Sequence, residues 1–135
     1  MLVSIVLILS FGCDSSKGKP DLNQSKAIWN KVESEYSAMG PAEAYPLLQS
    51  AREELLQLSV SAPKALNYGS CLGVVNGRLF LVARSLGKTN EALRFLQEAE
   101  RHFNEQRRKD RLPMTNFSAE GMESIMKRRD AALPK

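Results

Sequence analysis

The sequence predicts an all-α protein: a small antiparallel bundle of two helix hairpins followed by a short C-terminal helix. Leu, Ala, Glu, Lys and Arg are plentiful, whereas aromatic residues make up only 7% of the chain, a composition that favours helix over strand. Apolar residues also recur at three- and four-residue steps, and no alternating strand pattern competes with them. The chain has 135 residues, which is enough for one modest domain.

The N-terminal region changes abruptly from apolar to polar at Cys13. Leu2–Phe11 is a run of uncharged residues, much shorter than the roughly 20 residues that cross a bilayer as a helix and typical of the apolar core of a signal peptide. Residues 14–25 are rich in Ser, Gly, Pro and charge, a composition typical of a flexible tether. We therefore expect a signal peptide over 1–12 and a tether over 13–22. An N-terminal helix packed into the core is the alternative.

The residues around the cysteine, Leu9-Ser10-Phe11-Gly12-Cys13, resemble the lipobox of bacterial lipoproteins, in which a small residue precedes the cysteine that receives a lipid. The resemblance implies cleavage between Gly12 and Cys13 and lipidation of Cys13. It places the mature chain in the bacterial cell envelope, anchored to a membrane outside the cytoplasm. Asp14 stands at the position that favours retention at the inner membrane in some enterobacteria.

The first hairpin begins the helical domain, which is expected over residues 23–112. Its first helix is expected to be capped by Asp21 or Asn23 and to end at Gly40. The apolar face of that helix carries Ala27, Ile28, Val32 and Tyr36.

The second helix of this hairpin contains a proline near its start. Because Pro46 would break an established helix, we expect the regular part of the helix to begin near it. The apolar face carries Leu47, Leu48, Ala51, Leu55 and Leu58.

The third helix is expected between the break at residues 59–63 and Gly87. Gly69, Gly73 and Gly77 fall every fourth residue, on one stripe of this helix. Each glycine costs a helix about 1 kcal/mol relative to Ala, so we expect a compensating contact. Close approach of a neighbouring helix is one explanation, and a ligand pressed against the stripe is the other.

The fourth helix is expected to start at Thr89 or Asn90 and to end at the basic residues 107–109, where cations suit the helix dipole. Leu112-Pro113 closes the domain. Residues 113–135 are expected to form a capping helix and a basic tail. The capping helix starts at Ser118 and places Met122, Ile125 and Met126 on one face.

Small residues recur in the two hairpins at similar spacing, which puts them where paired helices cross. In the first hairpin they are Gly40, Ala44 and Ala51, and in the second they are Gly87, Ala92 and Ala99.

This spacing resembles a degenerate tetratricopeptide repeat over residues 28–56 and 79–103. Trp29, Val32 and Tyr36 stand before the first glycine, where the repeat carries its large and aromatic residues. The resemblance implies stacked helix hairpins that bind other proteins. An ordinary antiparallel bundle is the alternative.

The sequence shows no set of residues typical of a catalytic or metal site. The single histidine, His102, lies one helical turn from Glu98, but no second nitrogen or thiolate is spaced to join them as a metal ligand. Cys71 is expected to be a buried thiol, and it can pair with Cys13 only if Cys13 carries no lipid. The carboxylates that fall on the expected wet faces of helices are Glu53, Glu54, Glu98 and Glu100.

The net charge of +4 arises in the C-terminal region, because residues 101–135 contain nine Lys or Arg against five Asp or Glu. No aromatic residues are interleaved with these basic residues as in nucleic-acid-binding surfaces. We therefore expect no nucleic-acid partner, and we interpret the basic end as a solvated surface.

The first hypothesis is a membrane-anchored extracytoplasmic lipoprotein that acts as a non-catalytic helical adaptor for a protein partner of unknown identity, with no metal and no cofactor. The alternative is a small-molecule or lipid-binding bundle that uses the stripe of Gly69, Gly73 and Gly77 and the Cys71 side of the third helix. A hydrolytic enzyme would require a closed cavity that holds His102 together with carboxylates.

Overall fold

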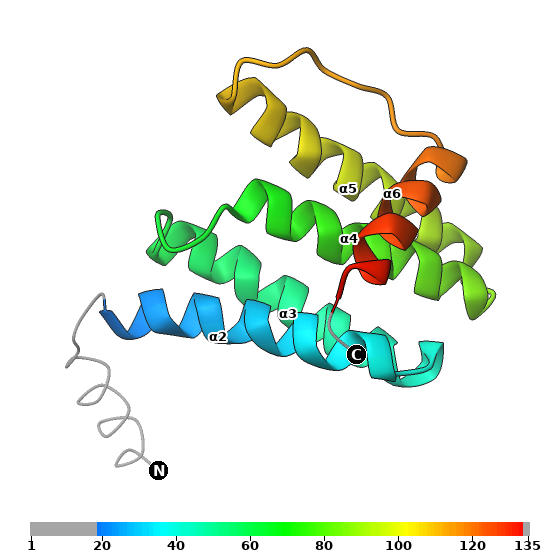
Figure 1. The fold of residues 1–135 in the computed structure, drawn as a ribbon, viewed down its shortest axis with the longest axis horizontal. Helices are drawn as coiled ribbons and strands as arrows, with labels where there is room; N and C mark the ends of the chain where they lie inside the picture. The colour runs from blue at the N-terminus through cyan, green and yellow to red at the C-terminus, as the bar shows by residue number, and fades with distance from the viewer. Residues whose placement is uncertain (1–18, 134–135) are drawn as a thin grey trace, which may run out of the picture.

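The computed structural model describes residues 19–133, with the side chains of residues 23–133. Within this range the chain is helical and contains no strand, so the predicted all-α bundle is confirmed (Figure 1). The helices are α2 (Lys19–Glu35), the 3₁₀ turn η1 (Tyr36–Ala38), α3 (Pro41–Ser61), α4 (Tyr68–Ser85), α5 (Thr89–Lys109) and α6 (Ala119–Ala131).

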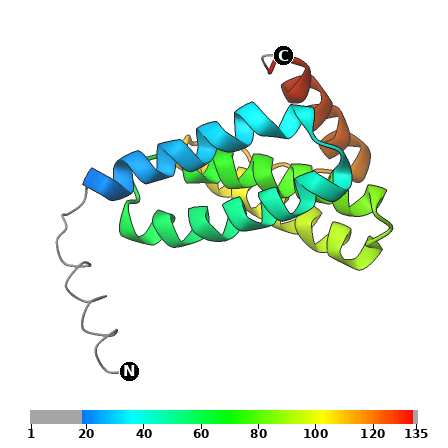
Figure 2. The same ribbon diagram turned by 90° about the horizontal axis from the view of Figure 1, so that it is seen from below.

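The helices form two antiparallel hairpins with a shorter helix laid across them. α2 pairs with α3, and α4 pairs with α5, while α3 packs against α4 and joins the two hairpins. α6 contacts α4 and reaches the C-terminal part of α2, as the view from below shows (Figure 2). α4 is therefore the central helix, with neighbours in α3, α5 and α6.

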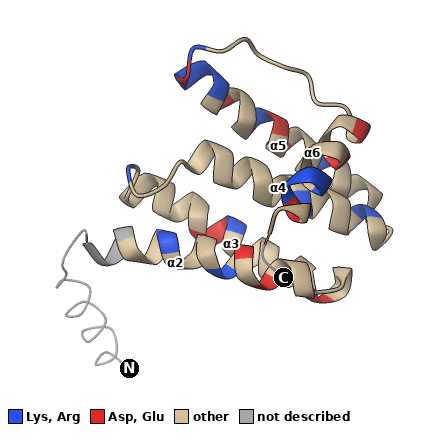
Figure 3. Cartoon of the chain, in the orientation of Figure 1, with Lys and Arg blue, Asp and Glu red and all other residues tan. Residues whose placement is uncertain are grey.

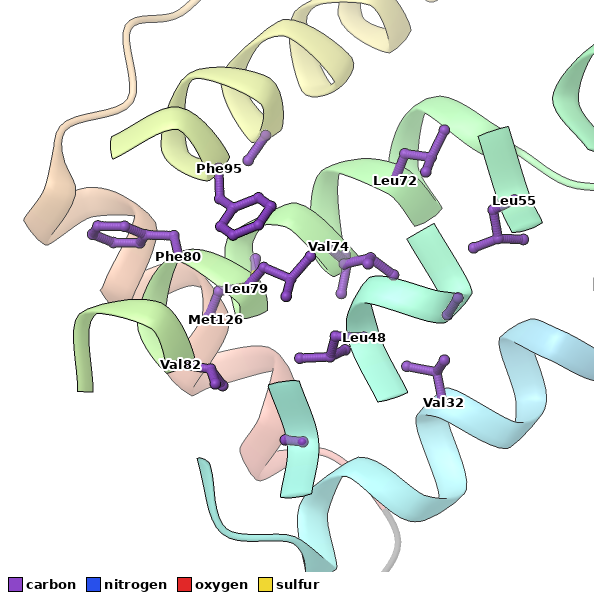
Figure 4. Packing of buried hydrophobic residues seen from close by; sticks show 14 of the residues in the cluster. Val32, Leu48, Leu55, Leu72, Val74, Leu79, Phe80, Val82, Phe95 and Met126 are labelled. Atoms are coloured by element: carbon purple, nitrogen blue, oxygen red, sulfur yellow. The ribbon is translucent and has the colours of Figure 1, made fainter. Parts of the chain in front are cut away.

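The core is organised around α4, whose residues 71–80 are all buried. A helix that is buried on every side is expected at the centre of a bundle rather than on its surface. Figure 4 shows how side chains from five helices meet there. Those labelled are Val32 of α2; Leu48 and Leu55 of α3; Leu72, Val74, Leu79, Phe80 and Val82 of α4; Phe95 of α5; and Met126 of α6.

The first hairpin differs from the sequence prediction at two helix starts. α2 begins at Lys19, so residues 19–22 are helical rather than part of a tether, and neither Asp21 nor Asn23 is its N-cap. α3 begins at Pro41, and Pro46 lies inside it. The apolar face of α3 thus outweighs the one backbone hydrogen bond that Pro46 removes.

The ends of the last two helices agree more closely with the sequence. Ser118 caps α6, since its Oγ accepts a hydrogen bond from the Gly121 N–H at 3.0 Å. α5 ends in three basic residues, although its N-cap is Lys88 rather than Thr89 or Asn90 and makes no side-chain cap. Figure 3 shows these basic residues at the end of α5, with further ones on α6.

Among the described helices, none combines the length and the apolar character that a membrane span requires.

Candidate functional site

The glycine stripe of α4 is covered by side chains of two helices. A Cβ on Gly69 would stand 3.0 Å from Cβ of Gln106, and a Cβ on Gly73 would stand 2.5 Å from the Phe103 ring, both on α5. A Cβ on Gly77 would stand 2.8 Å from Sδ of Met126 on α6. The bare surface that could face a ligand at Gly73 and Gly77 is thus filled by the protein itself.

The other small residues divide into two groups. Gly40 and Gly87 are exposed, and a Cβ on either would meet no atom within 4 Å, so these two glycines do not lie where helices cross. Gly87 has a φ of 76°, and it serves the tight turn between α4 and α5 in a conformation that suits glycine. The remaining members are buried in the core: Ala44, Ala51, Ala92 and Ala99.

His102 borders a cleft at the end of the bundle where the loop between α3 and α4 approaches α5. The cleft has a volume of about 450 Å³ and reaches from Leu56 to His102 and Lys109, with Gly69 in its wall. Arg101 donates a hydrogen bond to Nε2 of His102 at 3.2 Å, which makes Nε2 the acceptor and places the ring proton on Nδ1.

The polar groups around His102 form contacts with one another. Nδ1 of His102 faces Glu105 Oε1 at 3.6 Å, while Arg101 binds Glu98 at 2.7 Å and Glu105 at 3.5 Å. Burial lowers the pKa of His102, and the neighbouring Arg101 guanidinium lowers it further. The imidazole is therefore neutral near pH 7, and its nitrogens and carboxylate neighbours are occupied by contacts within α5.

Cys71 is buried on α4, with 7% of its surface exposed. Burial raises the pKa of its thiol to about 11, so it is protonated at neutral pH and is a poor nucleophile. Among the described residues, no group of three or more His, Cys, Asp or Glu side chains could hold a metal ion.

The most unusual polar residue is Arg78, which lies in the middle of the central helix and is 0% exposed. Its Nη1 contacts Glu33 Oε1 of α2 at 2.7 Å, and its Nη2 contacts Asp130 Oδ1 of α6 at 3.0 Å. The centre of the Tyr36 ring lies 4.5 Å from the guanidinium carbon. We call Arg78, Glu33, Tyr36 and Asp130 the Arg78 cluster; it joins α2, α4 and α6 at one point.

Next to the Arg78 cluster, a second arginine also contacts a carboxylate and an aromatic ring. Arg129 donates to Glu33 Oε2 at 3.1 Å and lies over the Trp29 ring at 5.6 Å. Burial, together with the charge and a hydrogen bond of the Asp130 carboxylate, raises the pKa of Tyr36 to about 12, although the charge of Arg78 acts in the opposite direction. The phenol is therefore neutral near pH 7.

Helical periodicity does not point to Arg78, because an arginine on an amphipathic helix is normally solvated. The sequence offers one signal: Arg78 and Arg84 are the only charged residues of α4, and Arg84 stands in its last turn. A charge isolated within an apolar helix must find partners from other helices, since an unpaired buried charge is very costly. Which carboxylates it meets depends on residues far away in the chain.

The predicted lipidation site, Cys13, and the signal peptide lie outside the residues that the structure describes. No family model, no curated protein and no solved structure matches this chain.

Proposed function

We propose that this protein is a lipoprotein of the bacterial cell envelope, anchored outside the cytoplasmic membrane through Cys13, and that its helices act as a non-catalytic adaptor for another protein. The anchor is inferred from the lipobox-like residues that end at Cys13. The adaptor role is inferred from the two helix hairpins, whose first helices, α2 and α4, both contact α6.

One observation carries the adaptor role: two polar residues that are buried in the central helix, Arg78 and Asn76, connect it to other helices. Arg78 joins α4 to α2 and α6. Asn76 is 0% exposed, donates to the Leu72 carbonyl at 2.9 Å and accepts from Arg52 of α3 at 2.9 Å. Polar contacts of this kind specify how helices meet, and a scaffold for protein recognition depends on that arrangement.

The alternative, a bundle that binds a small molecule or lipid along the glycine stripe, has less support. Phe103 and Met126 occupy the space over Gly73 and Gly77, and a ligand would have to displace both side chains. The cleft beside Gly69 is lined by charged and polar groups from α5, whereas lipid-binding pockets are mostly apolar.

The anchor is tested by metabolic labelling with an alkyne fatty acid. We expect the wild type and a Cys71→Ala control to incorporate the label and to sediment with membranes, and the Cys13→Ala variant to do neither. Equal labelling of the three proteins, or labelling of none, would refute the anchor.

The adaptor role is tested in cells with a photo-crosslinking amino acid at Trp29, beside the Arg78 cluster, and at Glu54, on the exposed side of α3. We expect one discrete protein adduct from position 29 and none from position 54. Identical adduct patterns at the two positions, or no adduct at either, would contradict a defined partner surface.

A further inference from the structure

The face of α2 and α4 that carries the Arg78 cluster is covered by α6 in a way that resembles the binding of a separate helix. Met122 and Met126 are both 0% exposed, with their sulfur atoms 3.2 Å and 2.8 Å from the Cβ position of Gly77. Asp130 follows four residues later and binds Arg78 through Nη2 at 3.0 Å and Nε at 3.1 Å. Residues four apart lie on one side of a helix, so α6 presents two apolar anchors and one carboxylate in a row.

The connection to α6 is held independently of α6 itself. Asn104 of α5 donates to the Thr115 carbonyl at 2.8 Å and accepts from the Thr115 N–H at 2.9 Å. Glu100 accepts from the Phe117 N–H at 2.8 Å, and Phe117 packs on Phe103 at a ring distance of 5.6 Å. The segment up to residue 117 can therefore stay on α5 while α6 turns away from Ser118 onward.

If α6 detaches, Arg78 on the surface beneath it still has a charged partner, Glu33. Glu33 and Tyr36 both belong to the α2 side of the Arg78 cluster, and water can replace Asp130 once the guanidinium is exposed. An arginine is a costly choice if α6 serves only to cover apolar surface, because apolar side chains at such sites often give equal or greater stability. An arginine does select for a carboxylate at one position of the occupying helix.

We propose that α6 is an intramolecular competitor of the partner and occupies the surface to which the partner binds. The face of α2 and α4 beneath it binds a partner helix with two apolar side chains four residues apart and an acidic residue four positions after the second, and α6 must leave before that helix binds. This inference rests on the proposed adaptor role and specifies the partner surface and its regulation.

The test uses a fluorescent synthetic peptide of residues 118–133 as the probe and the full chain, purified in detergent. In wild type the attached α6 competes at a high effective concentration. In a variant with Met122→Ser and Met126→Ser this competition is weakened, so we expect its affinity for the peptide, measured by fluorescence anisotropy, to exceed that of wild type by about tenfold or more. Equal affinity for the two folded proteins would overturn the proposal.

Matched peptides test the role of the carboxylate. Asp130→Ala in the peptide removes the partner of the buried Arg78, whereas Glu123→Ala removes the same charge from a pair with Arg84, whose side chain is 46% exposed. We expect the first peptide to bind at least about fivefold more weakly than the second, because exposed ion pairs contribute little. Equal binding of the two peptides would refute recognition through Arg78.

A milder chain variant, Asp130→Ala, leaves both methionines in place and serves if the double variant does not fold. We expect it to bind the unmodified peptide about threefold or more tighter than wild type does, and unchanged affinity would contradict the proposal. Concentration-dependent dimers in sedimentation would assign the face to α6 of a second copy and would also overturn it. Failure of these measurements leaves the lipid anchor untouched, whereas failure of the fatty-acid labelling leaves the peptide measurements valid.

Discussion

Two buried basic residues of neighbouring helices, Arg78 and His102, lie in different electrostatic surroundings. Arg78 meets carboxylates from α2 and α6 at 2.7 Å and 3.0 Å, so its burial is compensated by ion pairs. His102 is also buried, but Arg101 stands beside it and its nearest carboxylate oxygens are 3.6 Å and 3.9 Å away. Desolvation therefore dominates at His102 and lowers its pKa.

This difference predicts a pH dependence of stability that belongs to His102. Because its pKa is lower in the folded chain than in the unfolded chain, the unfolded state binds the proton first as the pH falls below about 6.5. The contribution of neutral His102 is thus present above that pH and is lost as the pH falls. Urea unfolding should show wild type losing stability relative to His102→Gln between pH 7 and 5, by at most about 1.4 kcal/mol per pH unit.

The comparison of these two proteins isolates a single imidazole, since His102 is the only histidine of the chain. The carboxylates titrate in both proteins alike, so their contribution cancels in the difference between the two profiles. Parallel pH profiles for wild type and His102→Gln would contradict the burial of a neutral imidazole.

At the scale of elements, the characteristic feature of α4 is the close approach of its neighbouring helices. Its glycines let the Phe103 ring of α5 and the Met126 side chain of α6 lie where a Cβ would stand. Close packing of this kind recovers the helix propensity that glycine loses, because every side chain laid on the stripe gains contacts across the interface.

A substitution at the middle of the stripe should therefore destabilise the bundle. Gly73→Ala gains about 1 kcal/mol of helix propensity, but its Cβ would stand 2.5 Å from the Phe103 ring, and overpacking of a core costs about 1–3 kcal/mol. We expect a net loss of unfolding free energy in urea titrations. The loss should be smaller when Phe103→Leu is already present, because the shorter side chain relieves the clash.

The control for this prediction is Gly40→Ser, at the N-cap of α3. A Cβ there meets no atom within 4 Å, and serine is a better N-cap than glycine, so this variant should be as stable as wild type or slightly more stable. If Gly73→Ala proved as harmless as Gly40→Ser, the glycine stripe would not be a packing surface.

At the scale of the whole molecule, stability is distributed unevenly among the helices. α4 is enclosed by α3, α5 and α6, and its residues 71–80 are all buried. α6 has 13 residues, of which Met122 and Met126 are buried. Segments with few buried side chains open at lower free energy than the core does.

Native-state hydrogen exchange should resolve this difference. We expect the amides of α4 between Val74 and Ala83 to exchange only through global unfolding, with the full denaturant dependence. The amides of α6 between Met122 and Asp130 should exchange through a local opening of lower free energy and weak denaturant dependence. A single opening free energy shared by α4 and α6 would show that α6 is an integral part of the bundle and does not detach.

Local patterns were enough to predict the helical class, the pairing of helices into hairpins, the Ser118 cap and the buried face of Met122 and Met126. These features follow from periodicity and capping chemistry, which act within a few residues. The helix starts at Lys19 and Pro41 could not be predicted in this way, because packing between helices determines how far a helix extends past a weak start.

The surfaces on which the helices meet could be known only from the folded chain. Folding placed α5 and α6 over the glycine stripe, buried His102 beside Arg101, and brought Glu33 and Asp130 to Arg78 from distant parts of the chain. The physical reason is that helical periodicity fixes the directions of side chains around one axis, whereas ion pairs and close contacts between helices depend on residues far apart in sequence.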